Sequence, residues 1–168
     1  IGHAYEHIEK REAWCDNVTP VSEIAILSEE SVSRGFVPAR HDQFGDEGAA
    51  RILLENQIPF DVIDTGDDFS RYRVLIVPDS VRMDDALAAA FKRFLAGGGR
   101  ALVSHLSGMA ADAERFVFPS SMTVRGESPW INDFIKAGEA LKDGLVESPF
   151  VAYRQAMRVD AGAGKVLA

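Results

Sequence analysis

Two serines, a histidine and a glycine lie close together near the end of the predicted strand 100–106. They are Ser104, His105, Ser107 and Gly108. Reacting groups in open α/β sheets gather at the carboxyl ends of the strands, so this stretch is the first candidate for a nucleophile. A nucleophile elbow has small residues on both sides, usually in the pattern G-x-S-x-G. Neither Ser104 nor His105 has that glycine pair, and Leu106 crowds Ser107 from the N-terminal side. The spacing therefore does not favour an elbow nucleophile.

A catalytic serine also requires a histidine base within hydrogen-bond reach. Ser104 and His105 are neighbours on a strand, so their side chains point to opposite faces. No histidine follows His105, and the others all precede the strand: His3, His7 and His41. We therefore expect no catalytic residue here. Ser104, His105, Ser107 and Gly108 are interpreted as a degenerate elbow whose hydroxyl groups cap the following turn.

Sites for a metal or a cofactor are not predicted either. His3 and His7 have the i, i+4 spacing that metal sites use, but the glutamate of the H-E-x-x-H pattern is absent. The glycine run "AGGGR" precedes a strand, whereas a dinucleotide-binding loop follows one. We expect no metal and no cofactor.

Four other residues are candidates for contacts with a ligand or with another domain. Asp79 and Ser80 end the predicted strand 72–80, and His41 with Asp42 lies in a long polar loop. Two acidic pairs are interpreted as structural. Glu29 and Glu30 are predicted to form a solvated strand exit, and Asp67 with Asp68 a turn.

The composition restricts the class of partner. The chain has 168 residues, 46% of them hydrophobic, which is enough for one α/β domain with a full core. Its formal net charge of −8 disfavours binding to nucleic acid or to an anionic membrane. A single cysteine, Cys15, provides neither a disulfide framework nor a multi-cysteine zinc site.

We interpret the sequence as a piece of a longer chain, because it does not begin with Met. Targeting signals would then lie outside it, and the compartment stays open. No apolar run approaches the roughly 20 residues that span a bilayer. We expect a soluble protein of the bacterial cytoplasm or periplasm.

Strand and helix patterns alternate through the first two thirds of the chain. Strands are predicted within 21–30, 58–64, 72–80 and 100–106, and helices at 3–14, 46–57 and 83–99. Continuous apolar runs such as 24–27 suit parallel strands that are buried on both faces. The alternation predicts a flavodoxin/Rossmann-like, three-layer α/β/α fold with a mostly parallel sheet.

The last third is less regular. Short strands are predicted at 114–119 and 121–126, a partly helical segment at 128–145, and a hairpin at 150–168 that turns at "DAGAG". Val151, Tyr153 and Met157 would lie near one face of that hairpin. The predicted organisation is a linker helix at 1–19, an α/β domain at 20–148, and the start of a C-terminal β segment at 149–168.

Two stretches carry a family resemblance. "DEGAARILLENQIPFDVID" and "YRVLIVPDSVRMDDALAAAFKRFLAGGGRALVSHLSG" resemble the class I glutamine amidotransferase-like domain of multidomain glycoside hydrolases, of the β-galactosidase trimerisation type. The resemblance covers about residues 20–110. Amidotransferases of this kind carry a cysteine in the elbow and a later His-x-Glu, and this chain has neither. The resemblance therefore implies the scaffold without the glutaminase chemistry.

That resemblance implies a non-catalytic accessory or oligomerisation domain of a β-galactosidase-like glycoside hydrolase. Residues 1–19 resemble the helix that leaves a preceding catalytic barrel. The implied partners are that barrel and further copies of the chain, as a homotrimer, with carbohydrate reached through the parent enzyme. Apolar residues are expected on the partner surface, namely Trp14, Phe36, Phe44 and Trp130.

Two alternatives remain open from the residues. One is a free-standing amidotransferase-like hydrolase that acts through Ser107 or His105. The other is a module for a sugar or small ligand, with a pocket at the strand ends lined by Asp79, Ser80, Ser104 and Ser107.

Overall fold

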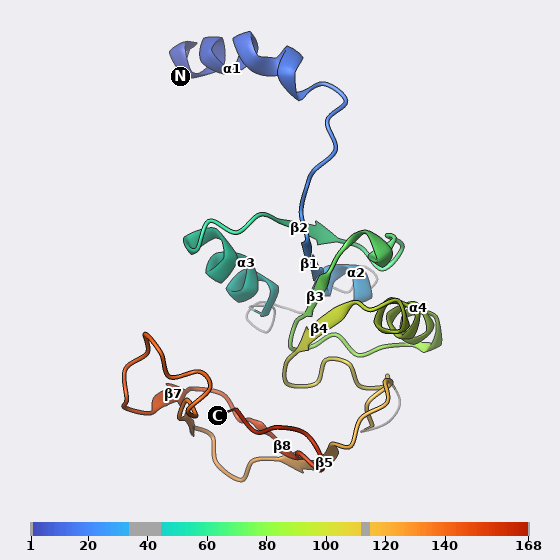
Figure 1. Ribbon diagram of the computed structural model, residues 1–168, viewed down its shortest axis with the longest axis vertical. Coiled ribbons are helices and arrows are strands. Elements are labelled where there is room, and N and C mark those ends of the chain that lie inside the picture. Colours follow the sequence, from blue (N-terminus) through green and yellow to red (C-terminus); the bar gives the residue numbers. More distant parts are fainter. Residues whose placement is uncertain (1, 34–44, 112–114, 168) are drawn as a thin grey trace.

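The computed structural model describes residues 2–33, 45–111 and 115–167. Its largest sheet has four parallel strands in the order β2-β1-β3-β4. The strands are β1 (Ile24–Leu27), β2 (Phe60–Ile63), β3 (Val74–Val77) and β4 (Arg100–Val103). Helix α3 (Gly45–Glu55) covers one face and α4 (Asp85–Ala96) covers the other (Figure 1). This arrangement confirms the predicted three-layer α/β fold.

The main core lies between the sheet and α4. Leu75 of β3 and Phe91 of α4 are both fully buried in it. Helix α4 begins at Asp84, whose carboxylate accepts a hydrogen bond from the Leu87 backbone N–H at 2.9 Å. It ends at the glycine run, where Gly98 takes a left-handed φ of 93°. Helix α4 thus forms within the range 83–99 that the sequence predicts.

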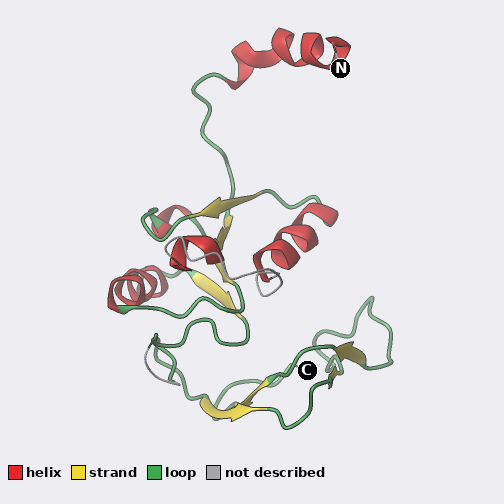
Figure 2. Ribbon diagram, turned by 180° about the vertical axis from the view of Figure 1, so that it is seen from behind, coloured by secondary structure: helices red, strands yellow, loops and turns green. Residues whose placement is uncertain are grey.

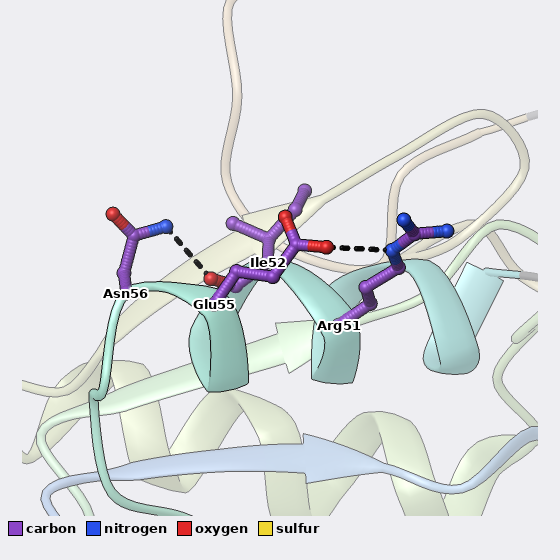
Figure 3. Close-up of polar contacts among 4 residues, drawn as sticks. All are labelled: Arg51, Ile52, Glu55 and Asn56. Carbon is purple, nitrogen blue, oxygen red and sulfur yellow. Dashed lines mark hydrogen bonds and ion pairs between the residues drawn. The ribbon is translucent and has the colours of Figure 1, made fainter.

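The opposite face of the sheet is covered by α3. Only Leu53 of this helix is buried. Its outer side carries an exposed ion pair, in which Arg51 Nε donates to Glu55 Oε1 at 2.8 Å (Figure 3). Next to that pair, Asn56 Nδ2 donates to the carbonyl of Ile52 at 2.8 Å. A single amphipathic helix therefore provides the whole described cover of this face.

Part of the range predicted as a long loop is helical. Helix α2 (Glu29–Ser33) begins two residues after β1 ends. A short 3-10 helix, η1 (Phe69–Arg71), joins β2 to β3 and was not predicted. The candidate contact residues His41 and Asp42, together with Phe36 and Phe44, lie outside the described residues.

The N-terminal helix extends away from the sheet. Helix α1 (Gly2–Cys15) confirms the helix predicted at 3–14, and none of its residues is buried. Trp14 is 81% exposed. A chain of extended residues separates α1 from β1 (Figure 1). No helix within the described ranges is long and apolar enough to cross a lipid bilayer.

The C-terminal third contains two small antiparallel sheets (Figure 2). One pairs β5 (Thr123–Glu127) with β8 (Met157–Asp160), and the other pairs β6 (Asp133–Ile135) with β7 (Phe150–Ala152). The helix predicted within 128–145 was therefore wrong. The hairpin predicted at 150–168 was also wrong, because β7 and β8 each pair with an earlier strand. Pro129, Gly138 and Gly144 interrupt any helix, and the strand partners are too distant for a local pattern to reveal.

Candidate functional site

The carboxyl ends of β3 and β4 are joined by a compact hydrogen-bonded turn. Ser104 Oγ donates to Asp79 Oδ1 at 2.6 Å, and the Leu106 N–H donates to the Asp79 carbonyl at 3.0 Å. Ser107 Oγ accepts from the Ser104 N–H at 2.7 Å. The structure therefore brings together three residues that the sequence placed at two strand ends. Their polar groups bond to one another across the gap between the strands.

This turn has two backbone positions in the left-handed region. His105 has φ of 49° and Gly108 has φ of 74°. A Cβ atom on Gly108 would lie 3.0 Å from Phe118 Cε1 and 3.2 Å from Val103 Cγ1. Glycine is therefore required at position 108 both for its conformation and for the space around it. The strained turn resembles that of an elbow, although the flanking glycine pattern is absent.

Neither serine in the turn is prepared as a nucleophile. Ser107 is 1% exposed, and its hydroxyl accepts the backbone N–H of Ser104. The Ser104 hydroxyl donates to a carboxylate. In the described part of the chain, no hydrogen bond joins either serine to a histidine, and His105 is exposed to solvent. Among the described residues, neither serine is therefore paired with the histidine that serves as base in a serine triad.

A groove of about 500 Å³ runs between this turn and the C-terminal segment. Its polar lining includes Asp79, Ser104, His105 and Ser107 from the strand ends. Apolar side chains face them from the other wall, among them Phe116, Met122, Ile135, Met157 and Val159. Three of the four residues expected to line a strand-end pocket therefore do so. Ser80 does not, and its hydroxyl instead donates to Glu29, the first residue of α2.

The partner of Ser80 is Glu29, a residue that sequence reasoning assigned to a solvated exit. The structure corrects this: Glu29 is only 3% exposed. Its Oε1 accepts from the Ser80 N–H at 3.0 Å and from Ser80 Oγ at 2.7 Å. Its Oε2 is buried and has no hydrogen-bond partner among the described residues. The chain turns into α2 at this point, which carries the side chain inward instead of out to solvent.

Glu29 occupies the crevice between β1 and β3, where the strand order reverses. This is the position at which open α/β sheets usually bind ligands. Gly45, the first residue of α3, closes over it, and a Cβ there would lie 3.0 Å from Pro78 Cβ and 3.2 Å from Glu29 Oε1. The crevice is therefore occupied by the chain's own residues, Glu29 and Gly45. No local signal predicted this, since the pairing of β1 with β3 is a tertiary contact.

Two further polar clusters are structural. The Asp64 carboxylate accepts from the Gly66 N–H and the Thr65 hydroxyl, both at 3.0 Å, and these bonds lower the pKa of Asp64. Hydrogen bonds from Ser70 likewise lower the pKa of Asp68, which caps η1. The turn predicted at Asp67 and Asp68 is confirmed. These exposed carboxylates stabilise loops on the surface of the α/β part.

At the other edge of the sheet, Tyr72 Oη donates to Asp61 Oδ2 at 2.8 Å, and Ser22 Oγ donates to Asp61 Oδ1 at 2.9 Å. Burial, followed by the bond to Asp61, raises the pKa of the Tyr72 phenol.

The candidate metal ligands on α1 are on an exposed surface. His3 pairs with Glu6 at 3.3 Å, and both side chains are solvated. Within the ranges that the structure describes, no three or more His, Cys, Asp or Glu side chains group so that they could hold a metal ion.

Comparison with known proteins finds a family model that matches part of the chain. Residues 51–123 match the family model of the β-galactosidase trimerisation domain. The match makes this part of the chain similar to that family's domain, over less than half of the 168 residues. It spans the end of α3, strands β2, β3 and β4, and the turn that contains Ser104 and Ser107.

Two curated relatives are β-galactosidases. GalA of Bacillus licheniformis is 38% identical over 64 residues, which are 38% of this chain and 10% of the relative. GanA of Bacillus subtilis is 37% identical over 59 residues, which are 35% of this chain and 9% of the relative. The aligned residues thus span about a tenth of the length of these relatives.

Solved structures match over almost the whole chain. α-L-Fucosidase isoenzyme 2 from Paenibacillus thiaminolyticus is 34% identical, with a TM-score of 0.85 over 99% of this chain and 25% of its own. The cold-adapted β-galactosidase from Rahnella sp. R3 has a TM-score of 0.72 over 96% of this chain and 26% of its own, at 18% identity. The second match shows the fold alone. Both matches extend the similarity beyond residue 123, into the C-terminal segment.

Proposed function

We propose that this chain assembles copies of a glycoside hydrolase into a homotrimer, and that the catalytic barrel lies elsewhere in the same polypeptide. The observation that carries the proposal is the family match over residues 51–123. The turn at Ser104 supports it, because the hydroxyl groups there are bonded within the turn, and among the described residues neither is bonded to a histidine. In this proposal α1 connects the domain to the barrel, and Trp14 is covered by it.

The exposed surface of the chain also supports an assembly. A compact monomer of 18.3 kDa would expose about 8,100 Å². This chain exposes 12241 Å², an excess of about 4,100 Å² over that expectation. Large apolar side chains are part of the exposed surface, among them Trp14 and Trp130. Contacts with other copies and with another domain would cover it.

The proposal is tested on the full-length protein by sedimentation velocity and by an activity assay. We expect a trimer, and an unchanged kcat/KM in the variant that combines Ser104→Ala with Ser107→Ala. A monomer at micromolar concentration would contradict the oligomerisation role. Loss of hydrolase activity in a double variant that is still trimeric would contradict the accessory role.

The amidotransferase-like scaffold is part of the same proposal. The β-strand order and the strained turn at Gly108 support a glutamine amidotransferase type of fold from which the nucleophile is missing. We expect no release of ammonia from glutamine, measured with a coupled glutamate dehydrogenase assay. Release that Ser107→Ala abolishes would restore the hydrolase alternative.

The sugar acted on by the parent enzyme is proposed to be a β-galactoside, on the basis of the curated relatives. A second candidate is an α-L-fucoside, because the Paenibacillus α-L-fucosidase is 34% identical over 99% of this chain. Carbohydrate then reaches this domain only through the parent enzyme. Assays of the full-length protein with 4-nitrophenyl β-D-galactopyranoside and 4-nitrophenyl α-L-fucopyranoside distinguish the two.

A further inference from the structure

The C-terminal segment, residues 123–167, has almost no interior of its own. Ser128 is its only fully buried residue. Thirteen of the large apolar side chains that the described residues expose lie here, against ten in the rest of the described chain. Two-stranded sheets are at best marginally stable in water unless another surface covers them. The segment therefore exposes apolar side chains of the kind that a partner surface normally covers.

Strands β6 and β7 present apolar side chains on both of their faces. Ile135 and Ala152 line the groove and so face the α/β part. Phe134 and Val151 lie opposite each other in register, and the alternation of side chains places them on the other face. Phe134 is 70% exposed, and Tyr153, two residues beyond Val151, is 80% exposed. We call Phe134, Val151 and Tyr153 the outer β6/β7 face.

Charge separates this region from the rest of the chain. Residues 1–122 contain 12 basic and 20 acidic side chains, whereas residues 123–168 contain six of each. The whole formal net charge of −8 therefore belongs to the part that precedes β5. Two copies of the chain would repel each other through their α/β parts and would not do so through their C-terminal segments.

We propose that the outer β6/β7 face binds a second copy of this chain. The inference rests on the proposed function, and it adds the location of the contact, in a region that lies beyond the residues matched by the family model. Aromatic side chains such as Phe134 and Tyr153 are typical of the centres of protein interfaces. A standard interface covers about 800 Å² on each partner, and the whole chain, α1 included, exposes about 4,100 Å² more than a compact monomer of its mass.

The decisive variant of the full-length protein combines Phe134→Glu with Tyr153→Glu. We expect the dissociation constant of the oligomer to rise about thirtyfold or more, since two contact residues at the centre of an interface are replaced by charges. The matched control is Leu54→Glu on α3, a side chain that is 66% exposed and belongs to the acidic part. That control should remain oligomeric, as should the conservative variant Phe134→Leu. Sedimentation velocity over a dilution series measures all four proteins.

The outcomes separate this inference from the proposed function. If the wild type is a monomer, the proposed function fails and this inference fails with it. If the wild type is a trimer and the double variant is an equally tight trimer, only the location is wrong. Loss of the oligomer in the Leu54→Glu control as well would also overturn the location, because it would show a general effect of added negative charge.

A second measurement avoids substitutions. Copies labelled with light and heavy isotopes are mixed, allowed to exchange and treated with a lysine cross-linker. Lys136 follows β6 directly and Lys142 lies seven residues beyond the end of that strand, so both report on its surroundings. We expect cross-links from these two lysines to join a light copy to a heavy one. If their cross-links form only within single copies of a trimeric protein, the inference is overturned.

Discussion

The α/β part and the C-terminal segment differ in how each is stabilised. Strands β1 and β3 are buried against α4 in a continuous apolar core, and Phe91 at its centre is fully buried. Strands β6 and β7 bury no side chain completely, although five of their six residues are apolar. A regular backbone ladder is therefore not by itself a sign of stability. What differs is the surface that covers each ladder.

The largest difference is expected from removing a phenylalanine in each region. Phe91→Ala should lower the free energy of unfolding by about 3–5 kcal/mol, because it leaves a cavity in the core. Phe134→Ala should change it by less than about 0.5 kcal/mol in the monomeric chain, because that ring is already solvated. Urea unfolding followed by circular dichroism measures both. Similar losses in the two variants would mean that the segment has a core in isolation.

A smaller contrast is expected between two glycines. Gly108 and Gly126 both have positive φ, at 74° and 83°, but only Gly108 is surrounded by side chains. Gly108→Ala should cost about 3 kcal/mol, from the backbone conformation and from contact with Phe118. Gly126→Ala should cost about 1–2 kcal/mol, from the conformation alone. Equal losses, measured by thermal unfolding, would contradict the close packing of the turn.

The buried carboxylate of Glu29 gives an intermediate effect. Glu29→Ala removes the acceptor of two hydrogen bonds from Ser80 and should cost about 1–3 kcal/mol. Ser80→Ala removes only the hydroxyl bond and should cost about 1 kcal/mol. In the double variant the losses should be less than additive, since the two residues share one interaction. Additive losses in urea unfolding would show that the residues act independently.

The smallest expected effect is a pH-dependent change of stability that arises from Tyr72, which is bonded to Asp61 of the edge strand β2. Burial and Asp61 raise the pKa of Tyr72 above its ordinary value of about 10. The folded state therefore keeps the phenolic proton longer than the unfolded state. The contribution is fully present below pH 10 and is lost as the pH rises through the folded pKa. Stability curves of the wild type and Tyr72→Phe should converge in alkali, and parallel curves would contradict this assignment.

The positions of the α/β elements could be predicted because their signals are local. Apolar runs at 24–27 and 74–77, the cap at Asp84 and the glycines after α4 each lie within a few residues of the element they define. The absence of an elbow nucleophile at Ser104 also follows from neighbouring residues. The C-terminal strands could not be predicted in this way, since β5 pairs with β8 across some 30 residues.

The candidate site likewise has features that local sequence predicts and features that only tertiary contacts determine. The sequence placed Asp79, Ser104 and Ser107 at strand ends, and the structure joins them by hydrogen bonds. The sequence placed Glu29 in solvent, and the structure buries it against Ser80. An acidic residue after a strand is normally solvated, and only the packing of α2 and Gly45 over the crevice makes this one an exception.

The sequence by itself determined the class of fold, the strand ends at which chemistry would occur, and the lack of a serine–histidine pair there. Periodicity, caps and spacing along the chain are sufficient for those conclusions. Only the tertiary structure decided which crevice is filled, which strands pair in the last third, and which apolar side chains stay uncovered. These depend on contacts between residues far apart in the chain, and burial is a property of those contacts rather than of any single stretch.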